Sequence, residues 1–159
     1  ARGRFVVVRA GVRDTVELPG GIVVLNRALV EDYEDPAVVA GFILAEGLRS
    51  RIEDPVARFL HDRGPIAALR LLATGEVTDA ALAAHAETLL AEPAPPVPDQ
   101  ALLARFREAD VPSSPYAFAR DISGETTLGL IEADPVDPEE ARPLLTDGEW
   151  ISLQGICTT

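Results

Sequence analysis

The chain has 159 residues, of which 47% are hydrophobic and 25% charged, and its net charge is -12. This length and composition predict one globular domain. The negative charge argues against nucleic acids and anionic membrane surfaces as partners, because both repel an acidic protein. The single cysteine, Cys157, excludes an internal disulfide and a multi-cysteine metal site, and we interpret it as an inert thiol.

The N-terminal part of the chain predicts two strands. Phe5 to Val8 and Ile22 to Leu25 are rich in β-branched residues, and Pro19-Gly20-Gly21 is a turn signal. Around the first strand the sequence places four arginines: Arg2, Arg4, Arg9 and Arg13. We interpret them as edge-strand charges that discourage aggregation, with a local basic patch as the alternative.

A short helical turn at residues 28 to 33 leads into one long helix at residues 36 to 50. Asp35 suits the N-cap position, and Pro36 suits the first helical position. From Pro36 to Leu44 apolar residues cover every face, which predicts a helix buried on most sides. Glu46 and Arg49 lie three residues apart on one face, within reach of a salt bridge.

Further helices are expected at residues 55–62, 65–73, 79–91 and 99–109, with a proline-rich connector at residues 92–98 inside the same domain. Residues 118 to 131 are interpreted as a hairpin. The spacing of Thr146 and Glu149 is that of a capping box, which predicts a helix from Trp150 onward. A strand at residues 150 to 156 is nearly as well supported.

Residues 18 to 50 resemble the core of zinc metallopeptidases of the membrane heat-shock protease and CAAX prenyl protease type, and of the minigluzincins. The Leu18-Pro19-Gly20-Gly21 turn, the strand after it and the buried helix carry this resemblance. It implies an α+β, zincin-like fold in one peptidase-like domain over residues 1–159. We expect a small antiparallel sheet, a buried central helix, several packed helices and a C-terminal hairpin.

In that family the helix carries H-E-x-x-H, whose two histidines bind zinc and whose glutamate activates the zinc-bound water. Here Ala45 and Arg49 stand at the histidine positions, and only Glu46 matches. Alanine has no donor atom, and an arginine cation repels a metal. The motif is therefore vestigial, and we expect neither a metal nor another cofactor. We interpret Glu46 as a carboxylate paired with Arg49, the alternative being a relic base in a cleft.

The preferred hypothesis is a catalytically inactive scaffold that binds an unknown protein or peptide. In active relatives the edge strand binds an extended peptide, so the resemblance places a peptide-binding edge at Ile22, Val23, Val24 and Leu25. One alternative is a hydrolase with a metal site rearranged around Glu46, Glu76 and either His61 or His85. The other is a structural or assembly domain of a larger envelope protein.

No apolar run approaches the ~20 residues of a membrane span, and no signal peptide is present. All 14 basic residues are arginines, which indicates a bacterium with a GC-rich genome. The chain contains no methionine, which predicts a processed form or an excised domain. A periplasmic or membrane-tethered location is compatible with these features.

Overall fold

The computed structural model describes residues 4–18, 21–52, 95–138 and 140–157, together with residues 57, 60, 61, 64, 66, 73, 74, 80 and 84. This part of the chain is a mixed α+β fold, as expected, with a three-stranded sheet and several helices. The helices expected at residues 55–62, 65–73 and 79–91 lie largely outside the described residues. None of the described helices is long and apolar enough to cross a membrane.

The sheet has the strand order β1-β3-β2. Its strands are β1 (Arg4–Val8), β2 (Thr15–Leu18) and β3 (Ile22–Asn26). β2 runs antiparallel to β3, whereas β1 runs parallel to it, with Arg4 opposite Ile22. The expectation of an antiparallel sheet is therefore wrong for β1.

The parallel pairing arises because residues 9–14 carry the chain across the end of β3. Asn26 holds this crossover in place: its side-chain amide donates hydrogen bonds to the carbonyls of Val12, at 2.5 Å, and Arg13, at 3.2 Å. Its backbone N–H donates to Asp14 O at 2.8 Å. One asparagine thus determines where β2 begins, on the far side of β3 from β1.

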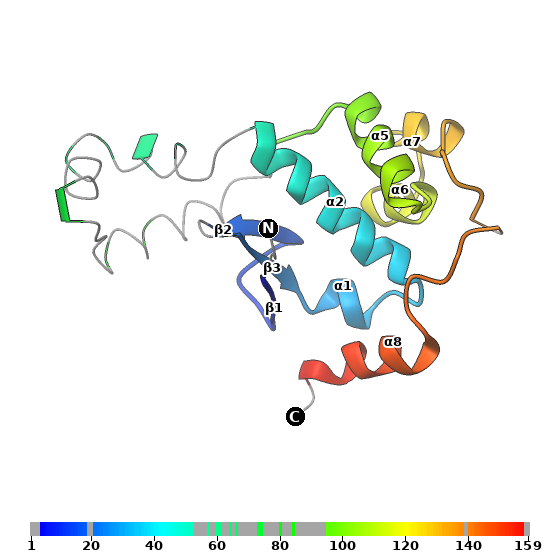
Figure 1. Cartoon of the computed structure of the whole chain (residues 1–159), viewed down its shortest axis with the longest axis horizontal. Helices are drawn as coiled ribbons and strands as arrows, with labels where there is room; N and C mark the ends of the chain where they lie inside the picture. The colour runs from blue at the N-terminus through cyan, green and yellow to red at the C-terminus, as the bar shows by residue number, and fades with distance from the viewer. Residues whose placement is uncertain are drawn as a thin grey trace.

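The long helix α2 (Pro36–Ile52) is the centre of the molecule, and its buried position confirms the expectation from its sequence. Asp35 caps it, because its Oδ1 accepts a hydrogen bond from Ala37 N at 2.8 Å. The sheet and α1 (Ala28–Glu31) lie on one side of α2, and α5, α6 and α7 lie on the other (Figure 1).

The C-terminal half of the described chain is helical, so the hairpin expected at residues 118–131 is wrong. Asp121 causes the difference, because its carboxylate accepts hydrogen bonds from Ser123 and Thr126 and closes a compact turn between two helices. These hydrogen bonds also hold the pKa of Asp121 well below its usual range. The helices of this half are α5 (Asp99–Ala109), α6 (Ser114–Arg120), α7 (Leu128–Glu132) and α8 (Asp147–Gln154), followed by the 3-10 helix η1 (Gly155–Cys157).

The capping box expected before Trp150 is confirmed, and residues 150–154 are helical rather than a strand. Thr146 Oγ1 accepts a hydrogen bond from Glu149 N, and the Glu149 carboxylate accepts one from Thr146 N at 2.9 Å. The hydrogen bonds that the backbone N–H and the hydroxyl of Thr146 donate to the Glu149 carboxylate lower the pKa of Glu149. Helix α8 therefore begins at a position that the sequence specifies locally.

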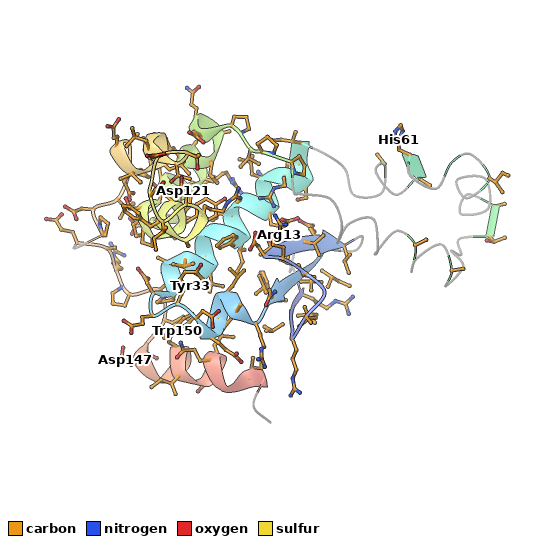
Figure 2. The ribbon with its side chains drawn as sticks, turned by 180° about the vertical axis from the view of Figure 1, so that it is seen from behind. Arg13, Tyr33, His61, Asp121, Asp147 and Trp150 are labelled. Atoms are coloured by element: carbon orange, nitrogen blue, oxygen red, sulfur yellow. The ribbon has the colours of Figure 1, made fainter. Side chains whose placement is uncertain are left out.

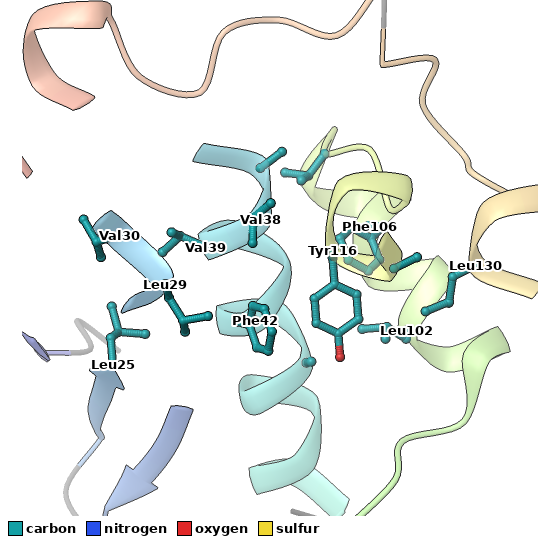
Figure 3. Packing of buried hydrophobic residues seen from close by; sticks show 14 of the residues in the cluster. Leu25, Leu29, Val30, Val38, Val39, Phe42, Leu102, Phe106, Tyr116 and Leu130 are labelled. Atoms are coloured by element: carbon teal, nitrogen blue, oxygen red, sulfur yellow. The ribbon is translucent and has the colours of Figure 1, made fainter. Parts of the chain in front are cut away.

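An aromatic cluster fills the space between α2 and the α5–α6 pair (Figure 3). Tyr116 of α6 meets Phe42 edge to face, with ring centroids 5.0 Å apart, and lies 5.7 Å from the ring of Phe106. Burial raises the pKa of Tyr116, while Arg120 acts in the opposite direction and donates to its hydroxyl at 3.3 Å. This cluster joins α2 to the C-terminal helices.

The N-terminus of α6 is capped from a distant position by Asp134. The Asp134 carboxylate accepts hydrogen bonds from the backbone N–H groups of Ser113, at 2.9 Å, and Ser114, at 2.7 Å. Partial burial works to raise the pKa of Asp134, but the hydrogen bonds from Ser114, Ser113 and Val136 outweigh it and lower the pKa. The ionised form of Asp134 is therefore favoured by folding.

We expect Asp134→Asn to make the protein less sensitive to acid. The folded pKa of Asp134 lies below its unfolded value of about 3.9. Ionised Asp134 therefore contributes to the free energy of unfolding of the wild type above that pH, and this contribution is lost as the pH falls through the folded pKa. Urea unfolding followed by the fluorescence of Trp150, the single tryptophan, measures the effect at pH 7 and pH 3. The exposed Asp32, changed to asparagine, is the control. Equal losses of stability in wild type and Asp134→Asn would contradict the assignment.

Candidate functional site

Glu46, the one residue that matches the peptidase motif, lies in a buried hydrogen-bond network. Its Oε1 accepts from Glu17 N at 2.8 Å, and its Oε2 accepts from the Thr15 hydroxyl at 3.1 Å and from Nη1 of Arg49. Glu46 is 7% exposed and Arg49 is 8% exposed. The expected pairing of Glu46 with Arg49 is therefore confirmed.

The same network extends beyond the carboxylate. Arg49 Nε donates a hydrogen bond to the carbonyl of Pro95 at 3.1 Å, so the guanidinium connects α2 to the chain that enters α5. Ala45 is fully buried in the hydrophobic core. A general base needs a lone pair directed at a reacting water. Protein groups already donate three hydrogen bonds to the Glu46 carboxylate, which is almost wholly buried, so the arrangement is suited to structural support.

The described residues do not assemble the rearranged metal site of the hydrolase alternative. His61 is exposed, and Glu76 and His85 lie outside the described residues. Within the part of the chain that the structure describes, no group of three or more His, Cys, Asp or Glu side chains is placed to hold a metal ion.

The peptide-binding edge expected at Ile22, Val23, Val24 and Leu25 is not an edge, and that assignment is wrong. These residues form the middle strand β3, whose backbone pairs with β1 on one side and β2 on the other. The cause is the crossover at residues 9–14, which places β1 against the side of β3 that an added peptide would need. Val23, Val24 and Leu25 are also buried.

The outer edge of β2 is closed by α2. Asn26 N donates to Asp14 O, so the backbone N–H and C=O groups of alternate residues from Asp14 onward point toward β3. The backbone groups of Thr15 and Glu17 therefore point away from β3. The outward N–H of Glu17 is the group that donates to Glu46 Oε1. Glu46 therefore occupies a position that a pairing strand would otherwise take.

Within the part of the chain that the structure describes, no strand pairs with the outer edge of β1, and this edge is open along its first half. Arg4 N donates to Gly21 O at 3.0 Å, and Arg27 N donates to Val8 O at 2.9 Å. The backbone N–H and C=O groups of Arg4, Val6 and Val8 therefore point toward β3. The backbone groups of the alternate residues Phe5 and Val7 therefore face outward.

Side-chain exposure agrees with this open edge. Phe5 is 55% exposed and Val6 is 44% exposed, whereas Val7 and Val8 are half-buried. β1 is thus an edge strand, as the interpretation of the surrounding arginines assumed, while their effect on aggregation stays a prediction and Arg2 lies outside the described residues. The arginines were the sequence signal for this edge, although the resemblance directed attention to β3.

A separate pocket of about 250 Å³ lies between the start of α2, the chain at residues 138–145 and the first turn of α8. Trp150 lines it, and no described residue accepts a hydrogen bond from its Nε1, which is sealed from solvent. The polar side chains of the pocket lining are Glu34, Asp35, Arg142 and Asp147. Figure 2 shows Asp147 and Trp150 on α8, well away from Arg13 at the sheet. No residue of the vestigial motif contributes to this pocket.

Three features thus stand out in the described chain: a buried Glu46 network, an open β1 edge and a pocket beside Trp150. Comparison with known proteins adds no assignment to any of them. No family model matches the sequence, no curated protein matches it, and no solved structure matches the fold.

Proposed function

We propose that this chain is a non-catalytic protein-binding domain that pairs with an extended segment of a partner protein along β1. The observation that carries the proposal is the open first half of β1, where Phe5 and Val6 are exposed and the backbone groups of Phe5 face outward. Strand addition at such an edge supplies main-chain hydrogen bonds, and the alternate side chains supply specificity.

The surroundings of Glu46 are the reason that we propose a non-catalytic domain. Its oxygens accept hydrogen bonds from Thr15, Glu17 and Arg49, and the residue is 7% exposed, so a water or a substrate has little access to it. A zincin-like ancestry of the scaffold is part of the proposal and is supported by the buried helix α2 with its single motif glutamate. The central position of β3 counts against that ancestry, but binding at β1 does not depend on it.

Phe5→Pro tests the proposal, because it removes an outward N–H while leaving the hydrogen bonds between β1 and β3 in place. The probe is a fluorescein-labelled hexapeptide that alternates threonine and valine, titrated by fluorescence polarisation. We expect Phe5→Pro to weaken binding by at least tenfold with little change in the urea midpoint. Phe5→Ala, which keeps the N–H, separates the loss of the side chain from the loss of the donor.

Val6→Pro is the structural control, because the N–H of Val6 faces β3 and its loss should lower the urea midpoint. Amide hydrogen exchange gives a second readout: bound peptide should slow the exchange of Phe5 and Val7 and leave that of Val6 unchanged. Binding by Phe5→Pro with wild-type affinity would overturn the proposal.

A further inference from the structure

The charge of the protein is divided sharply along the sequence. Residues 1–13 contain four arginines and no acidic residue, which gives this stretch a charge of +4. The remaining residues carry the other ten arginines and all 26 acidic residues, which gives a charge of -16. The open edge strand, which itself carries Arg4, therefore lies within a positively charged stretch of an acidic protein, and such an asymmetry indicates a charged partner.

The arginines that bear on β1 are exposed. Arg4 begins the strand and Arg9 follows its last residue, so the two Cα atoms are about 16 Å apart at ~3.3 Å per residue. Arg4 forms no ion pair with any carboxylate in the described part of the chain. A strand of five or six residues that pairs with β1 would extend from one arginine to the other.

The alternation of β1 assigns a face to each type of side chain. Phe5 and Val7 are opposite Val23 and Leu25 of the core, so they lie on the sheet face that packs against the helices. Arg4 lies on the other face. Val6 and Val8 share that face with Arg4, so an added strand would contact Phe5 and Val7 with one set of alternate residues and Arg4, Val6 and Val8 with the other.

We infer that the segment that pairs with β1 is acidic, with Asp or Glu alternating with apolar residues. This inference rests on the proposed function and specifies the chemistry of its partner. The charges disfavour a second copy of this chain as the occupant, because pairing β1 with β1 would bring two +4 stretches together. The remaining residues of each copy carry a net charge of -16, so two copies also repel each other outside β1.

Three labelled hexapeptides test the inference: one alternating glutamate and valine, one threonine and valine, and one lysine and valine. We expect the acidic peptide to bind about tenfold more tightly than the neutral one at low salt, the sum of a few exposed ion pairs. The difference should shrink at 0.3 M salt because of screening. The lysine peptide should bind most weakly.

Arg4→Glu should remove the preference for the acidic peptide. Arg142→Glu is the matched control, because this side chain is 90% exposed and belongs to the loop that lines the pocket beside Trp150. It should leave the order of the three peptides unchanged. A block peptide of three glutamates followed by three valines separates alternation from charge, and we expect it to bind more weakly than the alternating one.

The outcomes distinguish this inference from the proposed function. Equal binding of the acidic and neutral peptides, both lost in Phe5→Pro, would overturn the acidic partner and leave binding at β1 intact. Binding of all peptides that persists in Phe5→Pro would overturn both. A dimer seen by sedimentation that Phe5→Pro dissociates would make a second copy the occupant and overturn the acidic partner.

Discussion

Gly41→Ala is expected to destabilise the protein, whereas Gly47→Ala, on the same helix, is expected to stabilise it. A Cβ at Gly41 would lie 2.4 Å from the Cβ and 2.8 Å from the Cγ of Tyr116, far inside van der Waals contact. A Cβ at Gly47 would meet nothing within 4 Å. Both positions are helical, so the two substitutions gain the same intrinsic propensity and differ in their surroundings.

The magnitudes decide the sign. Alanine improves on glycine inside a helix by about 1 kcal/mol, which is the whole expected effect at Gly47. Overpacking costs about 1–3 kcal/mol, and more where the backbone has to move. At Gly41 the obstructing atom is the Cβ of Tyr116, so relief requires α6 to move away from α2. Urea unfolding followed by Trp150 fluorescence measures both variants, and stabilisation of Gly41→Ala would show that α2 and α6 are less closely packed.

The second large effect is expected at Arg49. Replacing Arg49 with methionine leaves the buried carboxylate of Glu46 without its counter-charge, and breaking a buried pair in this way costs about 3–5 kcal/mol. It also removes the donor to the Pro95 carbonyl. We expect the double variant Glu46→Gln with Arg49→Met to be more stable than Arg49→Met alone, because a neutral amide needs no counter-charge.

A double-mutant cycle on Glu46 and Arg49 measures the coupling, and chemical denaturation of all four proteins provides the data. If Arg49→Met lowers the free energy of unfolding by less than about 0.5 kcal/mol, the pair behaves as a hydrated surface ion pair, which would contradict its assignment as a buried pair.

The features that the sequence predicted correctly depend on residues close together in the chain. Asp35 caps α2, Thr146 and Glu149 form the capping box of α8, and Glu46 pairs with Arg49 at a spacing of three. Each of these signals is complete within one helical turn.

One error is local: the Asp121 turn that replaces the expected hairpin involves only residues 121–126. The other errors concern relations between distant segments. Whether β3 is an edge depends on where β1 and β2 lie, and nothing in residues 22–25 determines that order. The start of α6 is capped by Asp134, from about 20 positions away. Likewise, the carboxylate that accepts a hydrogen bond from the outward N–H of Glu17 and closes the β2 edge belongs to Glu46 of α2, 29 residues further along the chain.

The crossover between β1 and β2 also has a consequence for the order of folding. β2 and β3 are neighbours in sequence and pair across a short turn, so they can form early from local contacts. β1 pairs with β3 through residues 18 positions apart, such as Arg4 with Ile22, and contributes only half-buried side chains to the core. We therefore expect β1 to dock last and to be the strand that detaches while α2 and its helices stay folded. The same edge that we propose for partner binding is thus the natural starting point for local unfolding and for strand exchange between copies.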